Sequence, residues 1–325
     1  MKKTLIITTI NPKTEAVDAF ANLLEDWEII LVGDKKSQSI EDEGNITFLS
    51  VEKQKEIEFE TADVTPYNHY ARKNIGYLYA IKSGAEVIYD TDDDNIPYQN
   101  WVFPKFKQSE LVTTESRYWN VYKHFTEEKV WPRGYPLDEI NSKISYSEKK
   151  KEVDIGVWQG LADKEPDVDA IHRLTIGKQI IFNTHPPITL DKHVYCPFNS
   201  QNTLWRKNSF PLLYLPSTVS FRFTDILRGY ITQRLLWKND HHLGFTQSTV
   251  YQDRNEHDLM ADFKSEIDCY LQSKSVVNIL ESINLDEDYL ESLKKVYTAL
   301  SKEGIVSDLE LNRLEAWSND IKILI

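Results

Sequence analysis

Four aspartates in the stretch GAEVIYDTDDDNIP are the side chains of this sequence best suited to chemistry. They stand at positions 90, 92, 93 and 94, directly behind the apolar run VIY. So many like charges at the end of a buried element require a positive partner. Carboxylates are the ligands that Mg²⁺ and Mn²⁺ use when phosphate oxygens and water complete the coordination shell. We therefore predict that Asp92 and Asp94 hold one of these cations.

A cation in this position would explain how an acidic protein binds a diphosphate. The chain has a net charge of −13, so the end of a sheet cannot neutralise a nucleoside diphosphate without help. A divalent cation binds the carboxylates on one side and the diphosphate on the other, and it stabilises the diphosphate as it leaves. An Asp-x-Asp element just after a buried strand is typical of nucleotide-sugar transferases. The structural alternatives are a solvated acidic turn or a Ca²⁺ loop.

The elements that must position these residues alternate between strand and helix. Apolar runs predict strands over 5–7, 29–32, 46–51 and 86–89, and apolar stripes predict helices over 12–24, with Asn11 as N-cap, and over 70–83. Strands that alternate with helices pair in parallel through right-handed crossovers. We therefore expect an α/β fold, a Rossmann-like α/β/α sandwich with a mainly parallel sheet. Polar residues end three of these strands, at the edge where open parallel sheets bind ligands.

Arg72 and Lys73 lie in the first turn of the helix predicted over 70–83. The free N–H groups and the dipole of a helix N-terminus favour anions, so two basic side chains there require a negative partner. A diphosphate is one such partner. The acidic side chains of Glu60 or Asp63 in a solvated turn are an equally good one.

Asp225 is the candidate for acid–base chemistry. It stands at the start of a helix predicted over 224–237, with Arg222 and Arg228 on either side. A carboxylate in this position can remove a proton from an attacking hydroxyl. It can equally serve as the N-cap of the helix. The sequence leaves these two roles open.

Other polar side chains supply candidates for contacts to a sugar and a diphosphate. Asn199, Gln201 and Asn202 have amides that can hydrogen-bond sugar hydroxyls. The segment DRNEHD at 253–258 offers Arg254 to a diphosphate and His257 to the cation.

Composition and charge narrow the class of protein. The chain has 325 residues, 41% of them hydrophobic, and its net charge of −13 argues against a general nucleic-acid binder. The cysteines, Cys196 and Cys269, lack metal-type spacing and indicate reduced thiols in the cytosol. The apolar run of the opening MKKTLIITTI is too short for a signal peptide, and no stretch approaches the ~20 apolar residues of a membrane span. We expect a cytoplasmic protein, with association at a membrane surface or with other copies left open.

Helical patterns dominate the last part of the chain, where Leu314, Trp317, Ile321 and Leu324 form one apolar stripe. The middle, over 98–220, shows little periodicity. We predict a catalytic α/β domain over 1–260 and a C-terminal helical appendage over 261–325.

Several stretches together resemble the STELLO-type glycosyltransferases. They are TTINPKTEAV (8–17), WEIILVGDKK (27–36), RKNIGY (72–77), DTDDD (90–94), WPRGYPLD (131–138), GLADKEPDVDAIHRLT (160–175), PFNSQNTLW (197–205), LLYLPSTVSFRFTDILRGYITQRLLW (212–237) and QDRNEHDL (252–259). The resemblance covers about residues 4–270. It implies a GT-A-like fold and the soluble catalytic module of a family whose plant members are anchored in the Golgi membrane.

The motifs above and the resemblance together give the expected roles of individual residues. Those expected to bind the nucleotide and diphosphate are Thr8, Thr9, Gly33, Asp34, Arg72, Lys73, Asn74, Asp93 and Arg254; those expected at the metal are Asp92, Asp94 and His257. Asp225 lies where inverting members of the fold class keep their base. Asn199, Gln201, Asn202, Arg222 and Arg228 are the expected substrate contacts.

The reaction implied is an inverting, Mn²⁺- or Mg²⁺-dependent transfer of a sugar. The donor would be a nucleotide-diphosphate sugar, with a UDP sugar favoured, and the acceptor a hydroxyl of a glycan or lipid-linked glycan. One alternative is a non-catalytic nucleotide-sugar-binding scaffold or mutase-like protein of a polysaccharide pathway. A nucleotidyltransferase is a weaker alternative, because TTINP after the first strand lacks the glycine-rich loop that such an enzyme needs.

Overall fold

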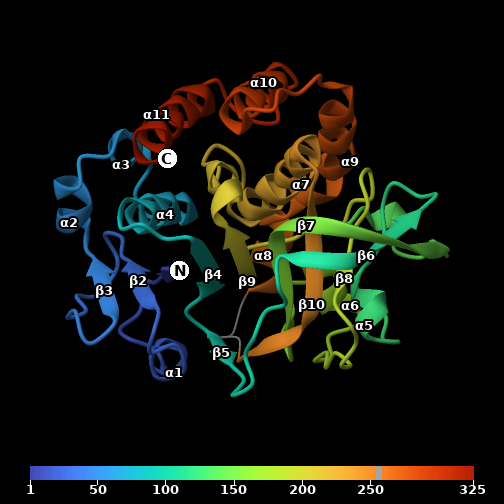
Figure 1. Cartoon of the computed structure of the whole chain (residues 1–325), viewed down its shortest axis with the longest axis horizontal. Coiled ribbons are helices and arrows are strands. Elements are labelled where there is room, and N and C mark those ends of the chain that lie inside the picture. The colour runs from blue at the N-terminus through green and yellow to red at the C-terminus, as the bar shows by residue number, and fades with distance from the viewer. Residues whose placement is uncertain (254–257) are drawn as a thin grey trace.

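A single sheet forms the centre of the computed structural model, which describes residues 1–253 and 258–325 (Figure 1). Its strands are β1 (Lys3–Thr8), β2 (Glu28–Val32), β3 (Ile46–Leu49), β4 (Val87–Asp92), β5 (Asn95–Pro97), β6 (Lys107–Thr114), β7 (Tyr146–Asp163), β8 (Ile188–Thr189), β9 (Asn202–Arg206) and β10 (His241–Gln252). The strand order is β3-β2-β1-β4-β9-β7-β10-β5, and off this path β6 pairs with β7 and β8 with β10.

The sheet is parallel in its first half and mixed beyond it. Strands β3, β2, β1 and β4 pair in parallel, as predicted. Strand β9 is antiparallel to both β4 and β7, whereas β10 runs parallel to β7. The chain forms β6 and β7 before it returns to insert β9 between β4 and β7. The predicted α/β fold is therefore confirmed, with a mixed sheet in place of a mainly parallel one.

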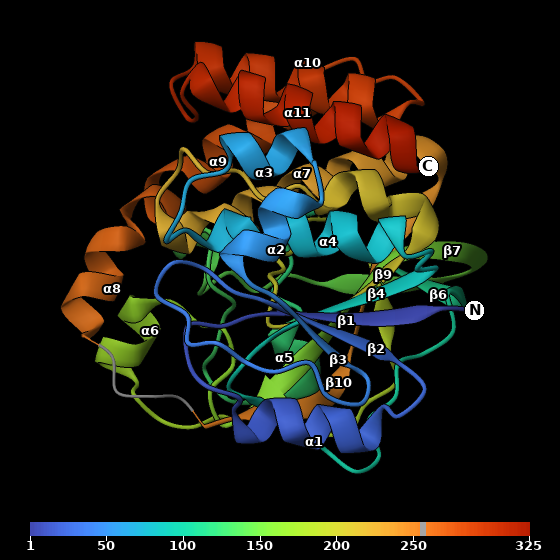
Figure 2. The ribbon, with the colours of Figure 1, turned by 90° about the vertical axis from the view of Figure 1, so that its left-hand side faces the viewer.

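Helices cover both faces of the sheet and give the expected three layers (Figure 2). They are α1 (Glu15–Leu23), α2 (Val51–Glu56), α3 (Glu60–Val64), α4 (Lys73–Lys82), α5 (Tyr122–Phe125), α6 (Ala170–Thr175), α7 (Thr224–Leu236), α8 (Leu259–Ser265), α9 (Ile267–Ser282), α10 (Tyr289–Lys302) and α11 (Leu309–Leu324). Helix α1 lies on one face, and α4, α7, α10 and α11 lie on the other. This is the α/β/α sandwich that the sequence predicted, built on a mixed sheet.

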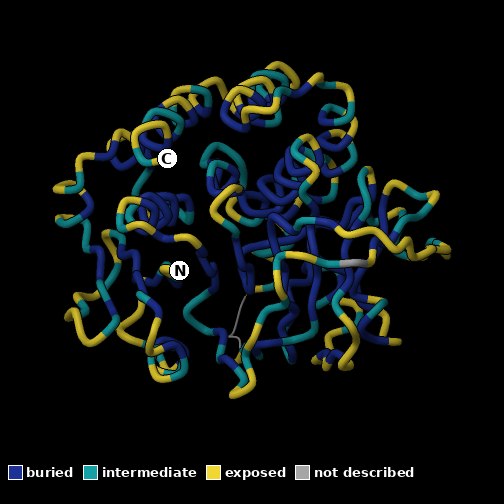
Figure 3. Tube along the Cα trace, in the orientation of Figure 1, coloured by how far each residue is buried: buried dark blue, intermediate teal, exposed yellow. Residues whose placement is uncertain are grey.

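Alternate side chains of the central strands enter two separate cores, because successive strand residues point to opposite faces. Ile6 of β1 belongs to the core that includes Ile75 of α4. Its neighbour Leu5 belongs to the core that includes Phe20 of α1. Figure 3 shows the strands buried through most of the sheet and the exposed residues at the periphery. The β1–β4 strand ends are thereby held in a rigid frame.

Helix α1 starts later than the sequence predicted. Its N-cap is Thr14, whose hydroxyl accepts a hydrogen bond from the Val17 N–H, so Asn11 is not the N-cap. The side chain of Asn11 instead donates a hydrogen bond to Asp93 at 3.0 Å. The segment between β1 and α1 is thus bound to the acidic tip of β4.

The C-terminal helices pack on the α/β part and share its core. Trp317 of α11 is fully buried in the same core as Ile6, and its indole N–H donates to the Pro211 carbonyl at 3.1 Å. The carboxylate of Asp320 accepts hydrogen bonds from the N–H groups of Glu60 and Thr61, at the start of α3. The predicted helical extension is present, and the division of the chain at residue 260 stays a prediction.

None of the helices in the described residues is long and apolar enough to cross a membrane.

Candidate active site

The carboxyl ends of β1, β2 and β4 border a cavity of about 470 Å³. Parallel pairing aligns these ends, because Thr8 is in register with both Val32 and Asp92. The predicted site residues that line the cavity are Thr8, Thr9, Gly33, Asp34, Arg72, Asp92, Asp93, Asp94, Gln201, Arg222 and Asp225. The structure thus brings the acidic tip of β4 and the start of α7 to one space.

Two aspartates of the acidic tip are positioned by neighbouring side chains. Oδ2 of Asp93 accepts hydrogen bonds from the Thr9 hydroxyl at 2.5 Å and from Nδ2 of Asn11 at 3.0 Å. Oδ2 of Asp94 accepts one from Nε2 of Gln252 at 2.8 Å. Asp93 therefore fastens the tip of β4 to the loop after β1, a role that the sequence did not separate from ligand binding.

Asp92 lies in a field of like charge. Burial raises the pKa of Asp92 to about 8; Lys73, with Nζ 3.7 Å away, opposes the shift, and the carboxylates of Asp94, Asp90 and Asp225 add to it. Its side chain is still 33% exposed toward the cavity. A cation beside Asp92 would relieve this repulsion and favour the ionised carboxylate.

The donor set at this tip suits Mg²⁺ or Mn²⁺. Asp92 and Asp94 both line the cavity, and their side chains are carboxylates, the donors that hard cations prefer. Over residues 1–253 and 258–325, no group of three His, Cys, Asp or Glu side chains could hold a metal ion by itself. A cation held by two carboxylates completes its shell with phosphate oxygens and water, as Mg²⁺ usually does.

A buried ion cluster of Asp90, Lys73 and Arg228 lies next to the acidic tip of β4. Asp90, the first of the four aspartates, has no exposed surface. Its Oδ1 lies 2.5 Å from Nζ of Lys73, and its Oδ2 lies 3.3 Å from Nη1 of Arg228 and accepts a hydrogen bond from the Tyr77 hydroxyl at 2.6 Å. The charge of Asp90 is therefore balanced inside the protein, so this aspartate is structural.

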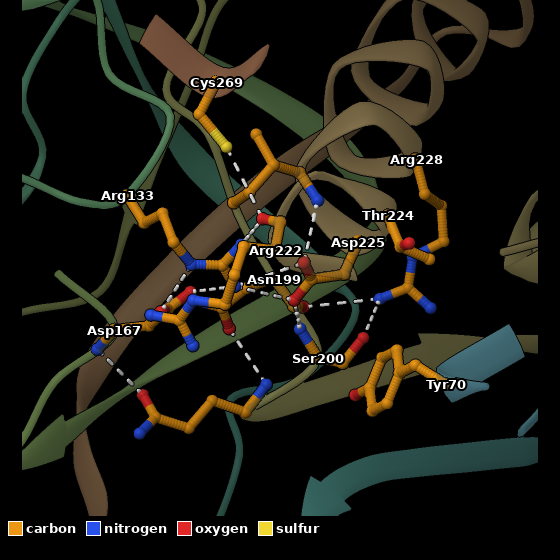
Figure 4. Close-up of polar contacts among 12 residues, drawn as sticks. Tyr70, Arg133, Asp167, Asn199, Ser200, Arg222, Thr224, Asp225, Arg228 and Cys269 are labelled. Atoms are coloured by element: carbon orange, nitrogen blue, oxygen red, sulfur yellow. Dashed lines mark hydrogen bonds and ion pairs between the residues drawn. The ribbon is translucent and has the colours of Figure 1, made fainter. Parts of the chain in front are cut away.

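Asp225 faces the cavity from the first turn of α7, bound to a buried arginine (Figure 4). Nη2 of Arg133 lies 3.1 and 3.2 Å from the two carboxylate oxygens of Asp225. The same guanidinium binds Asp167 through Nε and Nη2, both at 2.8 Å. The charge of Arg133 outweighs the effect of burial and lowers the pKa of Asp167. One arginine thus links two cavity carboxylates and fixes the position of Asp225.

The alternative role of Asp225 as the N-cap of α7 is not what the structure shows. The N-cap is Phe223, which makes no side-chain capping bond. Asp225 accepts hydrogen bonds from the N–H groups of Ser200 at 3.2 Å and of Ile226 at 3.0 Å. These contacts orient the carboxylate between α7 and the segment before β9.

The wall formed by β2 and the segment before α4 is rigid. Arg72 lines the cavity, but its guanidinium is buried and donates to Gln54 and to the carbonyls of Ala62 and Thr65. Burial lowers the pKa of Arg72. Oδ2 of Asp34 accepts the His69 N–H at 3.1 Å. Arg72 therefore shapes this wall more than it offers free hydrogen bonds to a ligand.

Five predicted site residues do not line the cavity, namely Lys73, Asn74, Asn199, Asn202 and Arg228. The side chains of Lys73 and Arg228 are buried, and both form ion pairs with Asp90. Asn74 binds the backbone of Leu215 at 2.9 Å through both its side-chain oxygen and its nitrogen. Asn202 is fully buried and binds Tyr89, Thr249 and the Leu161 carbonyl. The polar groups of these side chains are thus bonded to other buried groups of the protein.

Arg254 and His257, predicted to contact the diphosphate and the metal, lie outside the described residues. Of the predicted substrate contacts, Arg222 does line the cavity, and its guanidinium pairs with the buried Glu266 at 2.8 Å. Gln201 also lines it, with its amide bonded to Gln252 and to the Asp167 N–H.

Sequence reasoning missed several cavity residues. They are Asn11, Lys36, Asn68, His69, Tyr70, Arg133, Asp167, Arg173, Phe221 and Gln252. Arg133 and Asp167 stand in irregular segments, where no periodicity marks a buried charge, and Arg173 lies in the short helix α6. Their only signal was the family-like stretches WPRGYPLD and GLADKEPDVDAIHRLT.

Comparisons with known proteins give a consistent picture. A sequence model of the STELLO glycosyltransferases matches residues 222–325. A protein of Arabidopsis thaliana named "Probable glycosyltransferase STELLO1" is 29% identical over 98% of this chain and 44% of its own length. "Probable glycosyltransferase STELLO2" of the same plant is 28% identical over 98% of this chain and 44% of its own length. The predicted resemblance to this family is thereby confirmed.

The chain spans less than half the length of these curated relatives. A solved structure titled as that of a mycobacterial protein aligns with 86% of this chain and 73% of its own, at a TM-score of 0.42 and 8% identity. That likeness carries no argument about activity. The sequence relation, by contrast, extends over both walls of the cavity.

Proposed function

We propose that this STELLO-type glycosyltransferase chain moves a sugar from a nucleotide-diphosphate donor, a UDP sugar in the first instance, to a hydroxyl of a glycan or lipid-linked acceptor, with inversion at the anomeric carbon. One observation carries the proposal. A single cavity has two carboxylates suited to a divalent cation on one wall and a fixed carboxylate, Asp225, on the other. Metal-assisted departure of a diphosphate and removal of a proton from the acceptor require this pair of features.

The donor lies along the carboxyl ends of β1, β2 and β4. Thr9, Gly33 and Asp34 form the wall for the base and ribose. Asp92 and Asp94 are the residues that would hold Mn²⁺ or Mg²⁺, and the cation would offset negative charge on the diphosphate. The close approach of Gly33 to Phe48 keeps this wall flat: a Cβ at Gly33 would lie 2.6 Å from the Phe48 ring.

Cationic side chains at the cavity supply further charge for the leaving diphosphate. Arg222 and Arg173 line the wall that faces the acidic tip, each already paired with a glutamate. Lys36 lines the cavity next to Asp34 and forms no ion pair within the described residues. Lys36 can therefore turn to the diphosphate without breaking an existing ion pair.

The acceptor binds between the donor and α7. Asp225 takes the proton of the attacking hydroxyl, whose oxygen forms the new bond to the anomeric carbon while the bond from that carbon to the diphosphate oxygen breaks. The proton stays on Asp225 and the electron pair leaves with the nucleoside diphosphate. Arg133 holds Asp225 in place through the contacts at 3.1 and 3.2 Å, and attack on the face opposite the leaving group inverts the configuration.

Nucleotide binding and donor turnover test the proposal together. Thermal denaturation of the protein is recorded with UDP, GDP, CDP or ADP, once with Mn²⁺ equimolar to the nucleotide and once with chelator. In a second assay, release of UDP from UDP sugars is followed with water as the acceptor. We expect a rise in Tm with UDP that depends on Mn²⁺, and UDP release that stops in Asp92→Asn. No rise with any nucleotide, or UDP release that persists in chelator, would contradict it. Association with membranes or with other copies stays a prediction.

A further inference from the structure

Asp94, one of the two carboxylates of the proposed cation site, is held by a side chain from a distant part of the sequence. Strand β5, which follows Asp94 directly, pairs antiparallel with the end of β10, and the register places Gln252 opposite Asn95. Nε2 of Gln252 donates a hydrogen bond to Oδ2 of Asp94 at 2.8 Å. Both residues line the cavity. The position of this carboxylate therefore depends on a residue of β10.

Gln201 is fixed at both its main chain and its side chain. Its carbonyl accepts hydrogen bonds from the Thr91 hydroxyl at 2.6 Å and from Nδ2 of Asn95 at 3.0 Å, on either side of the acidic tip. Its side-chain oxygen accepts the Asp167 N–H at 3.1 Å, and its Nε2 donates to the Glu165 carbonyl at 3.1 Å. A backbone N–H only donates and a backbone carbonyl only accepts, so these contacts leave the Gln201 amide a single orientation.

The orientation of the Gln201 amide determines that of Gln252. Nε2 of Gln201 donates its other hydrogen bond to Oε1 of Gln252 at 3.0 Å. Because the oxygen of Gln252 faces Gln201, its NH₂ group is the end that faces Asp94. A neutral amide donor fixes a carboxylate without supplying a positive charge that would compete with a cation. Gln201 and Gln252 thus hold Asp94 in a way that is compatible with cation binding.

From these contacts we infer that Gln252 is a positioning residue for the proposed cation site, and that Gln201 holds Gln252 in place. The inference rests on the proposed function, because the cation is part of that proposal. Groups that hydrogen-bond a metal ligand set its orientation, and their removal weakens metal affinity about 10- to 100-fold. Gln201, which the sequence predicted as a contact to a sugar, has both donors of its amide engaged within the protein. Its role is therefore support of the cation site.

The same contacts connect the two walls of the cavity. The Asp167 N–H binds Gln201, and the Asp167 carboxylate binds Arg133, which also binds Asp225. Asp94 is thereby linked to Asp225 through side chains that all line the cavity. In a transfer reaction this relation matters, because the leaving diphosphate at the cation and the attacking hydroxyl at the base must be aligned on opposite sides of the anomeric carbon.

The metal-dependent gain in UDP affinity of the full chain measures the role of Gln252. This gain is the Kd of UDP in chelator, from ligand-observed NMR that detects weak binding, divided by the Kd with excess Mn²⁺, from calorimetry. Gln252→Met removes the amide and keeps the length of the side chain. Gln247→Met is the matched control, because Gln247 lies on the same strand β10 and does not line the cavity. Gln201→Met removes the residue that orients Gln252.

We expect the gain in Gln252→Met to fall about 10- to 100-fold below that of the parent, with the Kd of UDP in chelator unchanged. A general disturbance of the cavity would instead weaken UDP binding in chelator as well. Gln247→Met should keep the gain of the parent. Because Gln201 acts through Gln252, the double variant should lose no more of the gain than Gln252→Met alone.

The outcomes separate this inference from the function on which it rests. Absence of a gain in the parent removes the proposed cation site, and the inference with it. A gain in the parent that persists in Gln252→Met overturns the inference alone. An equal loss in Gln247→Met, or a loss of UDP affinity that is as large in chelator, overturns it too. A double variant that loses more than Gln252→Met contradicts the role given to Gln201.

Discussion

The ammonium of Lys73 lies 2.5 Å from Oδ1 of Asp90, at a position where neither side chain is exposed. Asp92, two residues further along β4, is 33% exposed and lines the cavity. Strand alternation cannot account for this difference, because residues two apart share one face of a strand. Between Asp90 and Asp92, strand β4 instead leaves the core and reaches the carboxyl edge of the sheet. Its position along the strand therefore decides whether an aspartate is structural or available to a ligand.

This division predicts opposite results for two conservative substitutions. Asp90→Asn leaves Arg228 buried without its counter-ion and Lys73 with only the more distant Asp92, and we expect it to lower the free energy of unfolding by about 3–5 kcal/mol. Asp92→Asn removes one of several crowded carboxylates, so we expect equal or higher stability together with loss of UDP release. Urea denaturation and the UDP-release assay measure the two effects.

Each variant replaces one carboxylate by an amide of nearly the same shape. Each therefore serves as the matched control of the other. Comparable losses of stability in the two variants would show that Asp92 is also part of the ion cluster. Full UDP release by Asp92→Asn would remove it from the proposed cation site.

The sequence predicted this edge of the sheet well, for a physical reason. Buried strands and amphipathic helices carry their own periodicity, so the apolar runs before Thr8, Gly33 and Asp90 located the carboxyl ends of the parallel strands. Partners were not predictable in the same way. Nothing in the sequence near Lys73 shows that its counter-ion is Asp90, because that contact depends on how α4 packs against β4.

The opposite wall was the less predictable one. Arg133 stands in an irregular segment and reaches Asp225 across 92 positions of the sequence. The insertion of β9 between β4 and β7, which sets this wall, depends on long-range pairing that local patterns do not record. Asn202 illustrates the consequence, since a polar side chain expected at the ligand is fully buried behind the sheet edge.

Asp225→Asn should lower kcat for transfer by about 10²- to 10⁴-fold, the usual contribution of a general base, without changing the Kd of UDP. Asp167→Asn is the matched control, because Asp167 binds the same guanidinium of Arg133. Both variants weaken the Arg133 cluster, but only Asp225 is proposed to accept the proton. Steady-state kinetics and UDP titration separate the effects. Equal losses of kcat in the two variants would indicate that the arginine cluster, and not Asp225 as a base, supports turnover.

Gly33→Ala should damage both stability and donor binding. The added Cβ would meet the Phe48 ring at 2.6 and 2.8 Å, and overpacking of this kind costs about 1–3 kcal/mol. Phe48→Leu shortens the opposing side chain, so we expect the double variant to lose less stability than the two single variants together. Unfolding free energies and UDP affinity of the four proteins give the coupling. Strictly additive losses would mean that the glycine is required for another reason.

Asp320→Ala tests whether the last helix supports the α/β part. Asp320 is buried and accepts the N–H groups of Glu60 at 3.1 Å and Thr61 at 2.8 Å, which otherwise have no intrahelical partner at the start of α3. Loss of these charge-assisted bonds should lower the free energy of unfolding by about 1.5–3 kcal/mol. Glu315→Ala, an exposed change in the same helix, controls for helix propensity and should have little effect. Urea denaturation that shows one transition in all three proteins, displaced only in Asp320→Ala, is the expected result. Two separate transitions in the parent would instead support an independently folding unit after residue 260.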